Sequence, residues 1–413
     1  VLGAGIAATA IAALVAGTPA LAGPGKKPAT KGNPNLTSVQ VLSFNDYHGH
    51  IEATDGPLSA IHDPSATPVG GAEYLSTKLT ELRAKVGDSK SLTVAAGDLI
   101  GGSPFLSGLF HDEPSVESLN AMGLDVSSVG NHEFDEGTDE LLRMQNGGCH
   151  PVDGCYFPDE PYAGADFPWL AANVIKKSNG RTFLPGTWVK EISGTKVGFI
   201  GMTLEGTDLL VSPGGISSVT FKDEVETANS AAKKLKKQGV KAIVVLMHEG
   251  GANAGTYNSC VGISEPIATM ATQFSPEIDH IVTGHTHNPY VCSIPDPAGN
   301  PRTVTSAADY GRVVTETNLV INRRSGEVDR RRTTSMNHLV TRTAKDPVQT
   351  EVIAKWKALS GELGAQVVGT HVEDIIGHSD PRSNRAIETP MGNLVADAIL
   401  WGTSGDNGGA QIA

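Results

Sequence analysis

The sequence is poor in basic residues, and this shortage argues against one broad class of function. It contains 32 Lys and Arg against 45 Asp and Glu, which gives a formal net charge of −13 at pH 7. Because binding of a polyanion needs clustered Lys and Arg, we expect no nucleic acid polymer among the partners. A small anionic substrate is compatible with this charge, since bound divalent cations would reverse the local sign.

Charged residues are absent from residues 1–22, which are rich in Ala, Leu, Ile and Val and end in Ala20-Leu21-Ala22. This pattern is typical of the apolar core and small-residue cleavage site of a secretory signal peptide. A membrane anchor is the alternative, because the stretch is about long enough to span a bilayer. Its Ala, Gly and Pro19 favour cleavage, so we expect a secreted protein without a stable membrane span and with a flexible leader over residues 23–36.

Cysteine is scarce, and no Cys-x-x-Cys pair supports a cysteine-bound zinc ion. Disulfides are expected instead, because a secreted chain passes through an oxidising compartment. The four cysteines allow three connectivities. We favour Cys149 with Cys155 and Cys260 with Cys292, since each pair would close a loop beside a segment that carries candidate metal ligands.

Five short apolar runs end in residues that can bind a metal ion. They are residues 41–44 before Asp46 and His48, 92–96 before Asp98, 126–129 before Asn131 and His132, 242–247 before His248, and 281–283 before His285 and His287. Open α/β sheets place their sites just past the carboxyl ends of strands, so these side chains are expected to converge. The mixed oxygen and nitrogen donors suit Zn²⁺, Mn²⁺ or Fe, and they are enough for two ions.

The stretch after residues 126–129 runs Gly130-Asn131-His132-Glu133-Phe134-Asp135. Gly130 allows the backbone to turn sharply at the end of a strand. Asp135 comes three residues after His132 and can orient its imidazole if the chain enters a helix there, as residues 136–144 suggest. A turn with a solvated histidine is the alternative for an Asn-His pair alone. The other four strand ends favour a hydrolase site.

The ordered blocks Asp46-x-His48, Gly97-Asp98, Gly130-Asn131-His132-Glu133, His248 and Gly284-His285-Thr286-His287 resemble the calcineurin-type metallophosphoesterases. Within them the chain is similar to the secreted bacterial 5′-nucleotidase branch, which also includes UDP-sugar hydrolase and 2′,3′-cyclic phosphodiesterase activities. The resemblance covers residues 39 to about 334, with a second piece near the end of the sequence. It implies a secreted protein of the bacterial cell envelope or medium.

The resemblance also implies roles for the candidate residues. Two divalent metal ions, Zn or Mn or similar, would share Asp98 as a bridging ligand. One ion would be completed by Asp46, His48 and His287, and the other by Asn131, His248 and His285. His132, held by Asp135, would stabilise the developing charge and protonate the leaving oxygen.

Strands interleaved with helices predict an α/β sandwich. We expect helices at residues 71–85 and 222–238, and strands that include 169–174, 196–202, 303–306, 313–321 and 328–334. The resemblance implies a four-layer α-β-β-α domain over residues 37–340 and a linker helix at 345–362. Residues 363–413, with a strand at 367–376 followed by a helix, would start a C-terminal substrate-binding domain that is cut short before its nucleoside-recognition loops.

These observations predict a secreted phosphohydrolase that removes phosphate from extracellular nucleotides by attack of metal-activated water. Its partner would be a small nucleotide or another phosphate ester, and the oligomeric state is not predicted. Two alternatives stay open: a hydrolase of cyclic nucleotides, UDP-sugars or sulfur esters, and a non-catalytic surface or adhesion protein. For the remaining eight histidines the default is a surface or loop position: His50, His62, His111, His150, His280, His338, His371 and His378.

Overall fold

The computed structural model describes residues 35–61, 67–377, 387–405 and 409–411, so the expected signal peptide and nearly all of the leader lie outside the described residues. The strands are β1 (Leu36–Phe44), β2 (Ser91–Ala96), β3 (Val126–Ser128), β4 (Trp169–Leu170), β5 (Val174–Lys176), β6 (Thr187–Ile192), β7 (Thr195–Thr203), β8 (Val219–Phe221), β9 (Ala242–His248), β10 (His280–Thr283), β11 (Tyr290–Ser293), β12 (Thr303–Ser306), β13 (Val313–Asn322) and β14 (Thr334–Leu339). The helices are α1 (Ala72–Ala84), α2 (Phe105–Gly108), α3 (Glu113–Met122), α4 (Gly137–Asn146), α5 (Glu224–Lys237), α6 (Ile267–Gln273), α7 (Pro347–Gly364) and α8 (Pro390–Thr403).

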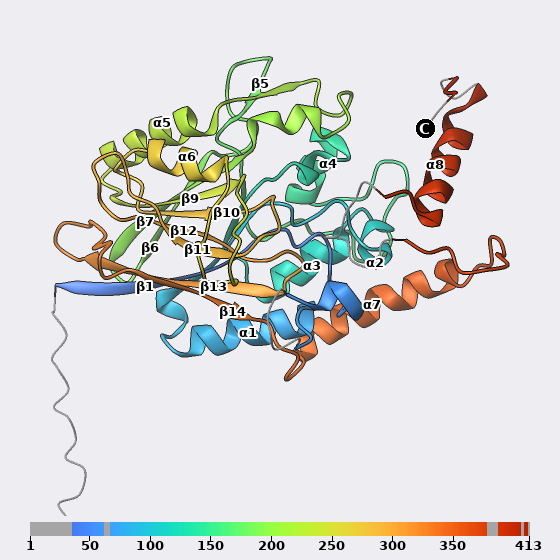
Figure 1. Ribbon diagram of the computed structural model, residues 1–413, viewed down its shortest axis with the longest axis horizontal. Helices are drawn as coiled ribbons and strands as arrows, with labels where there is room; N and C mark the ends of the chain where they lie inside the picture. The colour runs from blue at the N-terminus through green and yellow to red at the C-terminus, as the bar shows by residue number, and fades with distance from the viewer. Residues whose placement is uncertain (1–34, 62–66, 378–386, 406–408, 412–413) are drawn as a thin grey trace, which may run out of the picture. The chain divides into compact units, whose positions relative to one another are not determined.

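Two six-stranded sheets organise the described chain (Figure 1). One has the order β14-β13-β1-β2-β3-β4 and the other the order β11-β12-β10-β9-β7-β6. Strands β1 to β4 run parallel to one another, as do β7, β9, β10 and β12 in the second sheet. Because parallel strands end at the same edge, each sheet brings several loops together at its carboxyl edge.

The two sheets pack face to face, because their central strands are apolar on both sides. In β9, Val244 and Leu246 belong to the cluster between the sheets, whereas Ile243 and Val245 belong to the cluster under the outer helices. This alternation with period two is what a strand buried on both faces requires. The expected α/β sandwich is confirmed.

Helices cover both outer faces of the sandwich and complete four layers (Figure 1). Helices α5 and α6 contribute to the apolar cluster on one side, and α1, α3 and α7 to the cluster on the other. Helix α7, which the sequence predicts as a linker helix, packs against α1 and α3. Its Trp356 is 2% exposed and donates a hydrogen bond of 2.7 Å to Glu117.

Two of the expected strands are wrong. Residues 328–334 form mainly a turn, since the Asp329 carbonyl accepts from the amides of Arg332 and Thr333, and β14 begins only at Thr334. Residues 367–376 form no strand in the structure. Val367 and Val372 there are exposed, and β-branched residues favour a strand only where a pleated surface is available to pack against.

Both predicted disulfides are present, Cys149 with Cys155 and Cys260 with Cys292. The first closes the loop after α4, and the second ties the loop after β9 to strand β11. In the part of the chain that the structure describes, no helix combines the length and the apolar character needed to cross a membrane.

Candidate metal centre

The carboxyl ends of β1, β2, β3, β9 and β10 carry the seven residues predicted as ligands, and the structure brings six of them together. Three groups have ligand atoms that all lie within 4.8 Å of one another. They are Asp46 with His48 and His287, Asp98 with His248 and His285, and His48 with Asp98 and His132. The first two groups match the two sets expected from the sequence, except for Asn131, which is considered below.

The first set surrounds the Oδ1 atom of Asp46. His287 Nε2 lies 3.3 Å from this oxygen and His48 Nε2 lies 3.9 Å from it. The two imidazole nitrogens are 3.3 Å apart. Such spacings place three donor atoms around one point, as ligands of a single ion require.

Asp98 lies between the two sets. Its Oδ2 atom is 3.7 Å from His48 Nε2 in the first set and 2.8 Å from His248 Nε2 in the second. Its other oxygen, Oδ1, accepts a hydrogen bond of 2.9 Å from the amide of His132. Asp98 is therefore placed where one carboxylate can serve two ions.

Three of the histidines are oriented by a bond at Nδ1, which turns Nε2 toward the carboxylates. His48 Nδ1 lies 2.8 Å from the Gly101 carbonyl, and His248 Nδ1 lies 2.8 Å from the Ala96 carbonyl. His287 Nδ1 lies 3.0 Å from Asp309 Oδ2. A carbonyl or carboxylate on the second ring nitrogen is the usual support of a metal-binding histidine, because it fixes the tautomer and the ring orientation.

Two buried polar atoms at this edge are placed as ligands of a metal ion would be. Asn131 Oδ1 is buried and, within the described residues, accepts no hydrogen bond, whereas His248 Nε2, also buried, has the Asp98 carboxylate as its neighbour at 2.8 Å. A buried polar atom without a partner is costly, and such atoms in a native protein need an explanation. Both are ligands expected for the second ion, so the donor set fits the metal that the sequence implies.

The backbone is unusual at the same positions. Five predicted ligands have a positive φ, from 47° at His48 to 69° at His285, in a region that non-glycine residues rarely adopt. They are Asp46, His48, Asp98, His285 and His287. Conformations of this kind cost free energy and cluster at functional sites, where the surrounding structure enforces them.

Glycines make room for the ligands to approach one another. A Cβ on Gly97 would come within 2.8 Å of His248 Nδ1, and one on Gly284 within 2.9 Å of the same atom. A Cβ on Gly130 would collide with Asp98. Side chains at these three positions would displace the ligands, which explains why a glycine comes directly before Asp98, Asn131 and His285.

Protonation of the imidazoles follows their distance from the carboxylates. Burial lowers the pKa of His285 to about 4 and also lowers the pKa of His48. Burial acts in the same direction on His248, but Asp98 outweighs it and raises the pKa to about 10. Desolvation of His287 is likewise outweighed by Asp46, so its pKa is raised. The carboxylates thus favour a proton on the rings of His248 and His287. A cation would compete with these protons for the same ring nitrogens.

His132 and Asp135 form the pair expected from their spacing. His132 Nδ1 lies 2.7 Å from Asp135 Oδ2, and the segment His132–Phe134 forms a 3₁₀ turn ahead of α4. The hydrogen bond to Asp135 raises the pKa of His132 and outweighs desolvation. The His132 side chain is 35% exposed, so its imidazole can exchange a proton with a bound molecule or with solvent.

Glu133, which the sequence places beside the ligands, supports the backbone of the site. Its carboxylate accepts hydrogen bonds from the amides of Asp98 at 2.9 Å and Leu99 at 2.7 Å, and from the amide of Gly130. It therefore ties the loop after β2 to the loop after β3. Burial raises the pKa of Glu133 to about 7.

Asn45 and Asp309 also support the site, although neither was among the residues predicted from the sequence. Asn45 Nδ2 donates to Asp46 Oδ2 at 2.5 Å, and its Oδ1 accepts from the amide of Ala307 at 2.8 Å. Asp309, which orients His287, follows β12, a strand parallel to β10. The sequence held a sign of Asp309, because residues 303–306 were expected as a strand and sites often lie just after strand ends.

Two histidines expected at the surface or in loops are buried. His280 is fully buried in β10, where Nδ1 lies 2.9 Å from Thr303 Oγ1 and Nε2 lies 3.2 Å from Thr317 Oγ1. His50 is 7% exposed, and its ring stacks on Tyr310 with the ring centres 3.7 Å apart. The expectation of a surface or loop position is wrong for His280, whereas His50 does lie in a loop, the one after β1, although it is buried there. His62 and His378 lie outside the described residues.

A family model described as calcineurin-like phosphoesterase matches residues 39–289. The chain is 35% identical to endonuclease YhcR of Bacillus subtilis over 87% of its own length and 28% of that protein. It is 32% identical to cell wall protein Lmo0130 of Listeria monocytogenes, over 87% of the chain and 47% of the relative. It is 30% identical to a probable 5′-nucleotidase of Treponema pallidum, over 74% and 48% respectively. The chain therefore spans less than half the length of these relatives.

Solved structures agree on the fold. A 5′-nucleotidase precursor of Thermus thermophilus superposes with a TM-score of 0.68 at 24% identity, over 89% of this chain and 67% of that one. The NAD nucleotidase of Haemophilus influenzae gives 0.63 at 22% identity, over 81% and 62%. At these identities the likeness establishes the architecture, so the chemistry has to be argued from the residues of this chain.

Proposed function

Because the chain belongs to the calcineurin-like phosphoesterase family, we propose that it is a metal-dependent phosphoric ester hydrolase of the 5′-nucleotidase type. One observation carries the proposal: Asp98 lies between two sets of ligands, within 2.8 Å of His248 and 3.7 Å of His48. A binding module without chemistry has no need for two such sets. This argues against the alternative of a non-catalytic surface protein.

The residues divide between two divalent cations. Asp46, His48 and His287 would hold one ion, Asn131, His248 and His285 the other, and Asp98 both. A cation pair in such a site clamps the phosphoryl oxygens and lowers the pKa of the attacking water. The donor set mixes carboxylate, amide and imidazole, which suits Zn²⁺, Mn²⁺ or a similar ion.

His132 is our candidate for the general acid. Asp135 holds Nδ1, so Nε2 carries the proton that can be transferred, and the hydrogen bond to Asp135 raises the pKa of the imidazole, which favours its charged form. When water attacks phosphorus and the ester P–O bond breaks, this proton would pass to the leaving alkoxide oxygen. The positive charge of His132 also stabilises the transition state before the proton moves.

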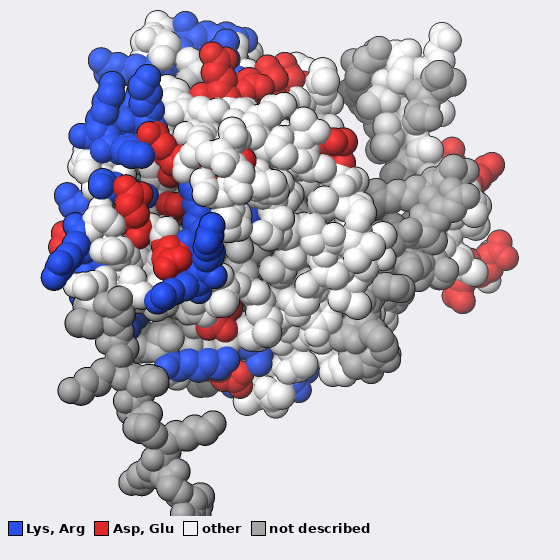
Figure 2. Space-filling model, turned by 60° about the vertical axis from the view of Figure 1, so that its left-hand side comes forward, with Lys and Arg blue, Asp and Glu red and all other residues white. Residues whose placement is uncertain are grey.

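The proposed substrate is a small phosphate ester, and among such esters we favour nucleotides. A nucleic acid polymer is the alternative that the Bacillus relative's name raises. The face in Figure 2 shows Lys and Arg gathered toward one edge with Asp and Glu among them, and a largely uncharged middle. A surface of mixed sign gives weak attraction for a polyanion, and the net charge of −13 points the same way. Cyclic nucleotides, UDP-sugars and sulfur esters stay as alternatives for the same scaffold.

We also propose an extracellular location and two folded parts. The two disulfides support an oxidising compartment, and the Listeria relative is named as a cell wall protein. Residues 37–340 would form the catalytic domain, 345–362 the linker helix, and 363–413 the start of a second domain. Helix α8 supports this last assignment, because its Leu394 and Ile399 are about half exposed and its apolar face lacks cover among the described residues.

A substrate panel tests the function. The purified chain, supplied with Zn²⁺ or Mn²⁺, would be assayed with 5′-AMP, a 2′,3′-cyclic nucleotide, UDP-glucose, p-nitrophenyl phosphate, a thiosulfate ester and single-stranded DNA, beside Asp98→Asn as the matched inactive variant. We expect metal-dependent release of phosphate from monoesters by the wild-type chain. The absence of turnover on every compound with the metals bound would favour the non-catalytic alternative.

A further inference from the structure

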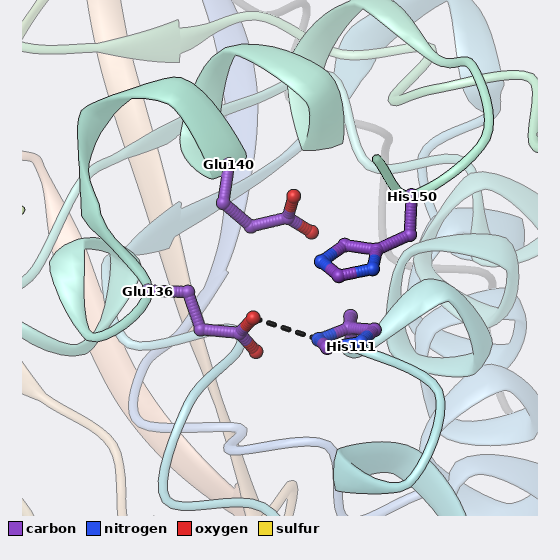
Figure 3. A group of neighbouring side chains, drawn as sticks. All are labelled: His111, Glu136, Glu140 and His150. Carbon is purple, nitrogen blue, oxygen red and sulfur yellow. Dashed lines mark hydrogen bonds and ion pairs between the residues drawn. The ribbon is translucent and has the colours of Figure 1, made fainter. Parts of the chain in front are cut away.

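A second group of potential ligands lies outside the candidate metal centre, and the sequence analysis assigned it no chemistry. It consists of His111, Glu136, Glu140 and His150, whose ligand atoms all lie within 4.8 Å of one another. Figure 3 shows the four side chains pointing toward one another, with the ring of His150 facing the carboxylate of Glu140. We call these four residues the His-Glu cluster.

The bonds within the cluster are short and specific. His111 Nδ1 lies 2.7 Å from Glu136 Oε2, and His111 Nε2 lies 2.8 Å from Oδ2 of Asp153 (Figure 3 draws the first). The rings of His111 and His150 stack with their centres 3.7 Å apart and their planes 16° from parallel. His150 Nδ1 accepts a hydrogen bond from the amide of Asp153 at 3.1 Å, which orients its ring.

Three separate segments contribute to the His-Glu cluster. His111 lies between α2 and α3, Glu136 and Glu140 lie at the start of α4, and His150 lies in the loop closed by the first disulfide. That disulfide fixes both ends of residues 149–155, so His150 is presented from a short closed loop. The cluster therefore joins three parts of the chain that do not belong to one helix or one sheet.

The net negative charge of this region favours a divalent cation. Glu136, Glu140, Asp153 and the nearby Glu113 supply four negative charges, and Arg143 supplies one positive charge through bonds of 2.7 Å to Glu140 and Glu113. With neutral imidazoles the local balance is about −3, and the side chains of His111 and His150 are only 19% and 11% exposed. The carboxylates of Glu113 and Glu140 are 4% and 11% exposed, whereas those of Glu136 and Asp153 are 46% and 51% exposed. Neighbouring carboxylates repel one another unless a cation or a proton lies among them, and the repulsion is stronger where they are buried.

Without an ion, the contacts of His111 with two carboxylates favour a proton on its ring. Desolvation lowers the pKa of His111, but its hydrogen bonds to Asp153 and Glu136 raise it more, so the pKa lies above the ordinary value. A metal ion would compete with this proton for the same ring nitrogen. Two imidazoles and two carboxylates are a donor set that zinc accepts in tetrahedral sites.

We propose that the His-Glu cluster is a zinc site with a structural role, separate from the two-ion centre and independent of the proposed function. Its ligands are His111 and His150 from two loops, and Glu136 and Glu140 from the start of α4. Arg143 orients the Glu140 carboxylate from outside, as supporting bonds do around metal ligands.

The position of this site gives it a consequence for the catalytic loops. Glu136 follows Asp135, the residue that holds His132. Asp112, next to His111, accepts a hydrogen bond of 2.8 Å from the amide of Gly101, whose carbonyl bonds to His48. Zinc bound between His111 and Glu136 would fasten the loop after β2 to the loop after β3 at their outer ends.

Zinc stoichiometry tests the proposal. The full chain, His111→Gln and His150→Gln would be dialysed against the same free Zn²⁺ concentration, and bound zinc would be counted by elemental analysis. We expect each variant to hold one zinc ion fewer than the wild-type chain. His338→Gln is the matched control, since His338 also pairs with a glutamate, Glu316, at 2.9 Å but lies in β14 away from the cluster. It should hold as much zinc as the wild-type chain.

Anomalous diffraction at the zinc edge keeps the test decisive if a variant folds poorly. Crystals of the wild-type chain grown with zinc should show a peak between the rings of His111 and His150 and the carboxylates of Glu136 and Glu140. Unchanged zinc content in both folded variants, or a map without a peak at the cluster, would overturn the proposal.

Discussion

The Oδ2 atom of Asp98 lies 2.8 Å from Nε2 of His248 at the point where strands of two different sheets end side by side. Strand β2 delivers the carboxylate and β9 the imidazole, and glycines directly before Asp98 and His285 allow the close approach. The two sheets therefore contribute different ligands to the site. The sheet of β1, β2 and β3 supplies all three oxygen ligands, and the other sheet supplies three of the four histidines.

Asp98→Asn should disable both metal positions at once. An amide has one oxygen acceptor where the carboxylate has two, so it cannot serve two cations in the same way. Since loss of a residue that only supports a ligand costs 10–100-fold in metal affinity, we expect loss of the shared ligand to cost more than about 100-fold. Metal content after dialysis and phosphatase rate would be measured together.

The control for that variant is Asp208→Asn, an exposed aspartate in the 3₁₀ segment Glu205–Leu209. It should behave as the wild-type chain. Full activity of Asp98→Asn with both ions retained would remove Asp98 from the bridging position.

His132→Ala should separate chemistry from metal binding. If His132 is the general acid, kcat should fall by roughly 10² to 10⁴-fold while both ions stay bound. Asp135→Asn should give a smaller loss in the same direction, because the imidazole keeps its place but loses the charge that raises its pKa. Loss of metal from His132→Ala would instead make His132 a ligand.

His280 should make the fold sensitive to mild acid. Burial lowers the pKa of His280 from the ordinary 6.5 to about 4 in the folded state. Below pH 6.5 the unfolded chain therefore binds a proton that the folded chain refuses, so this stability is present above that pH and is lost as the pH falls toward 4. Between about pH 7 and pH 5 the free energy of unfolding should drop by about 2 kcal/mol through this group alone.

Urea unfolding of the wild-type chain and His280→Gln at both pH values measures the effect. Glutamine does not titrate, so the variant should lose about 2 kcal/mol less than the wild-type chain over this interval. Parallel pH dependences would show that His280 takes up its proton in the folded state.

The longer disulfide loop should stabilise the fold more than the shorter one. Cys260 and Cys292 are 32 positions apart, whereas Cys149 and Cys155 are 6 apart. On a loop-entropy model, replacing Cys260 and Cys292 by alanine should cost about 4 kcal/mol, and replacing Cys149 and Cys155 about 2 kcal/mol. Denaturant unfolding of the two double variants tests this order, and a larger loss from the shorter loop would contradict it.

The sequence predicts the strands that hold the site, because β1, β2, β9 and β10 are apolar runs that stop at a polar residue. It also predicts the ligands that follow them within a few positions. It does not predict the burial of His280, since a single histidine in an apolar run gives no sign of the threonines that receive it from β12 and β13.

The His-Glu cluster is a further case. His111 and His150 are far apart in the chain and follow no strand, so only the packing of α4 against the loops brings them together. Residues 367–376 show the opposite failure, because a run of β-branched residues has strand propensity without a partner strand among the described residues.

The measurement that tests the central claim most directly is an anomalous difference map of the wild-type chain crystallised with Mn²⁺, an ion that suits carboxylate and imidazole ligands together. Our account predicts two peaks about 3.5 to 4 Å apart on either side of the Asp98 carboxylate. One should lie among Asp46, His48 and His287, and the other among Asn131, His248 and His285. A single peak, or peaks that leave Asp98 without contact to either ion, would contradict the two-metal account.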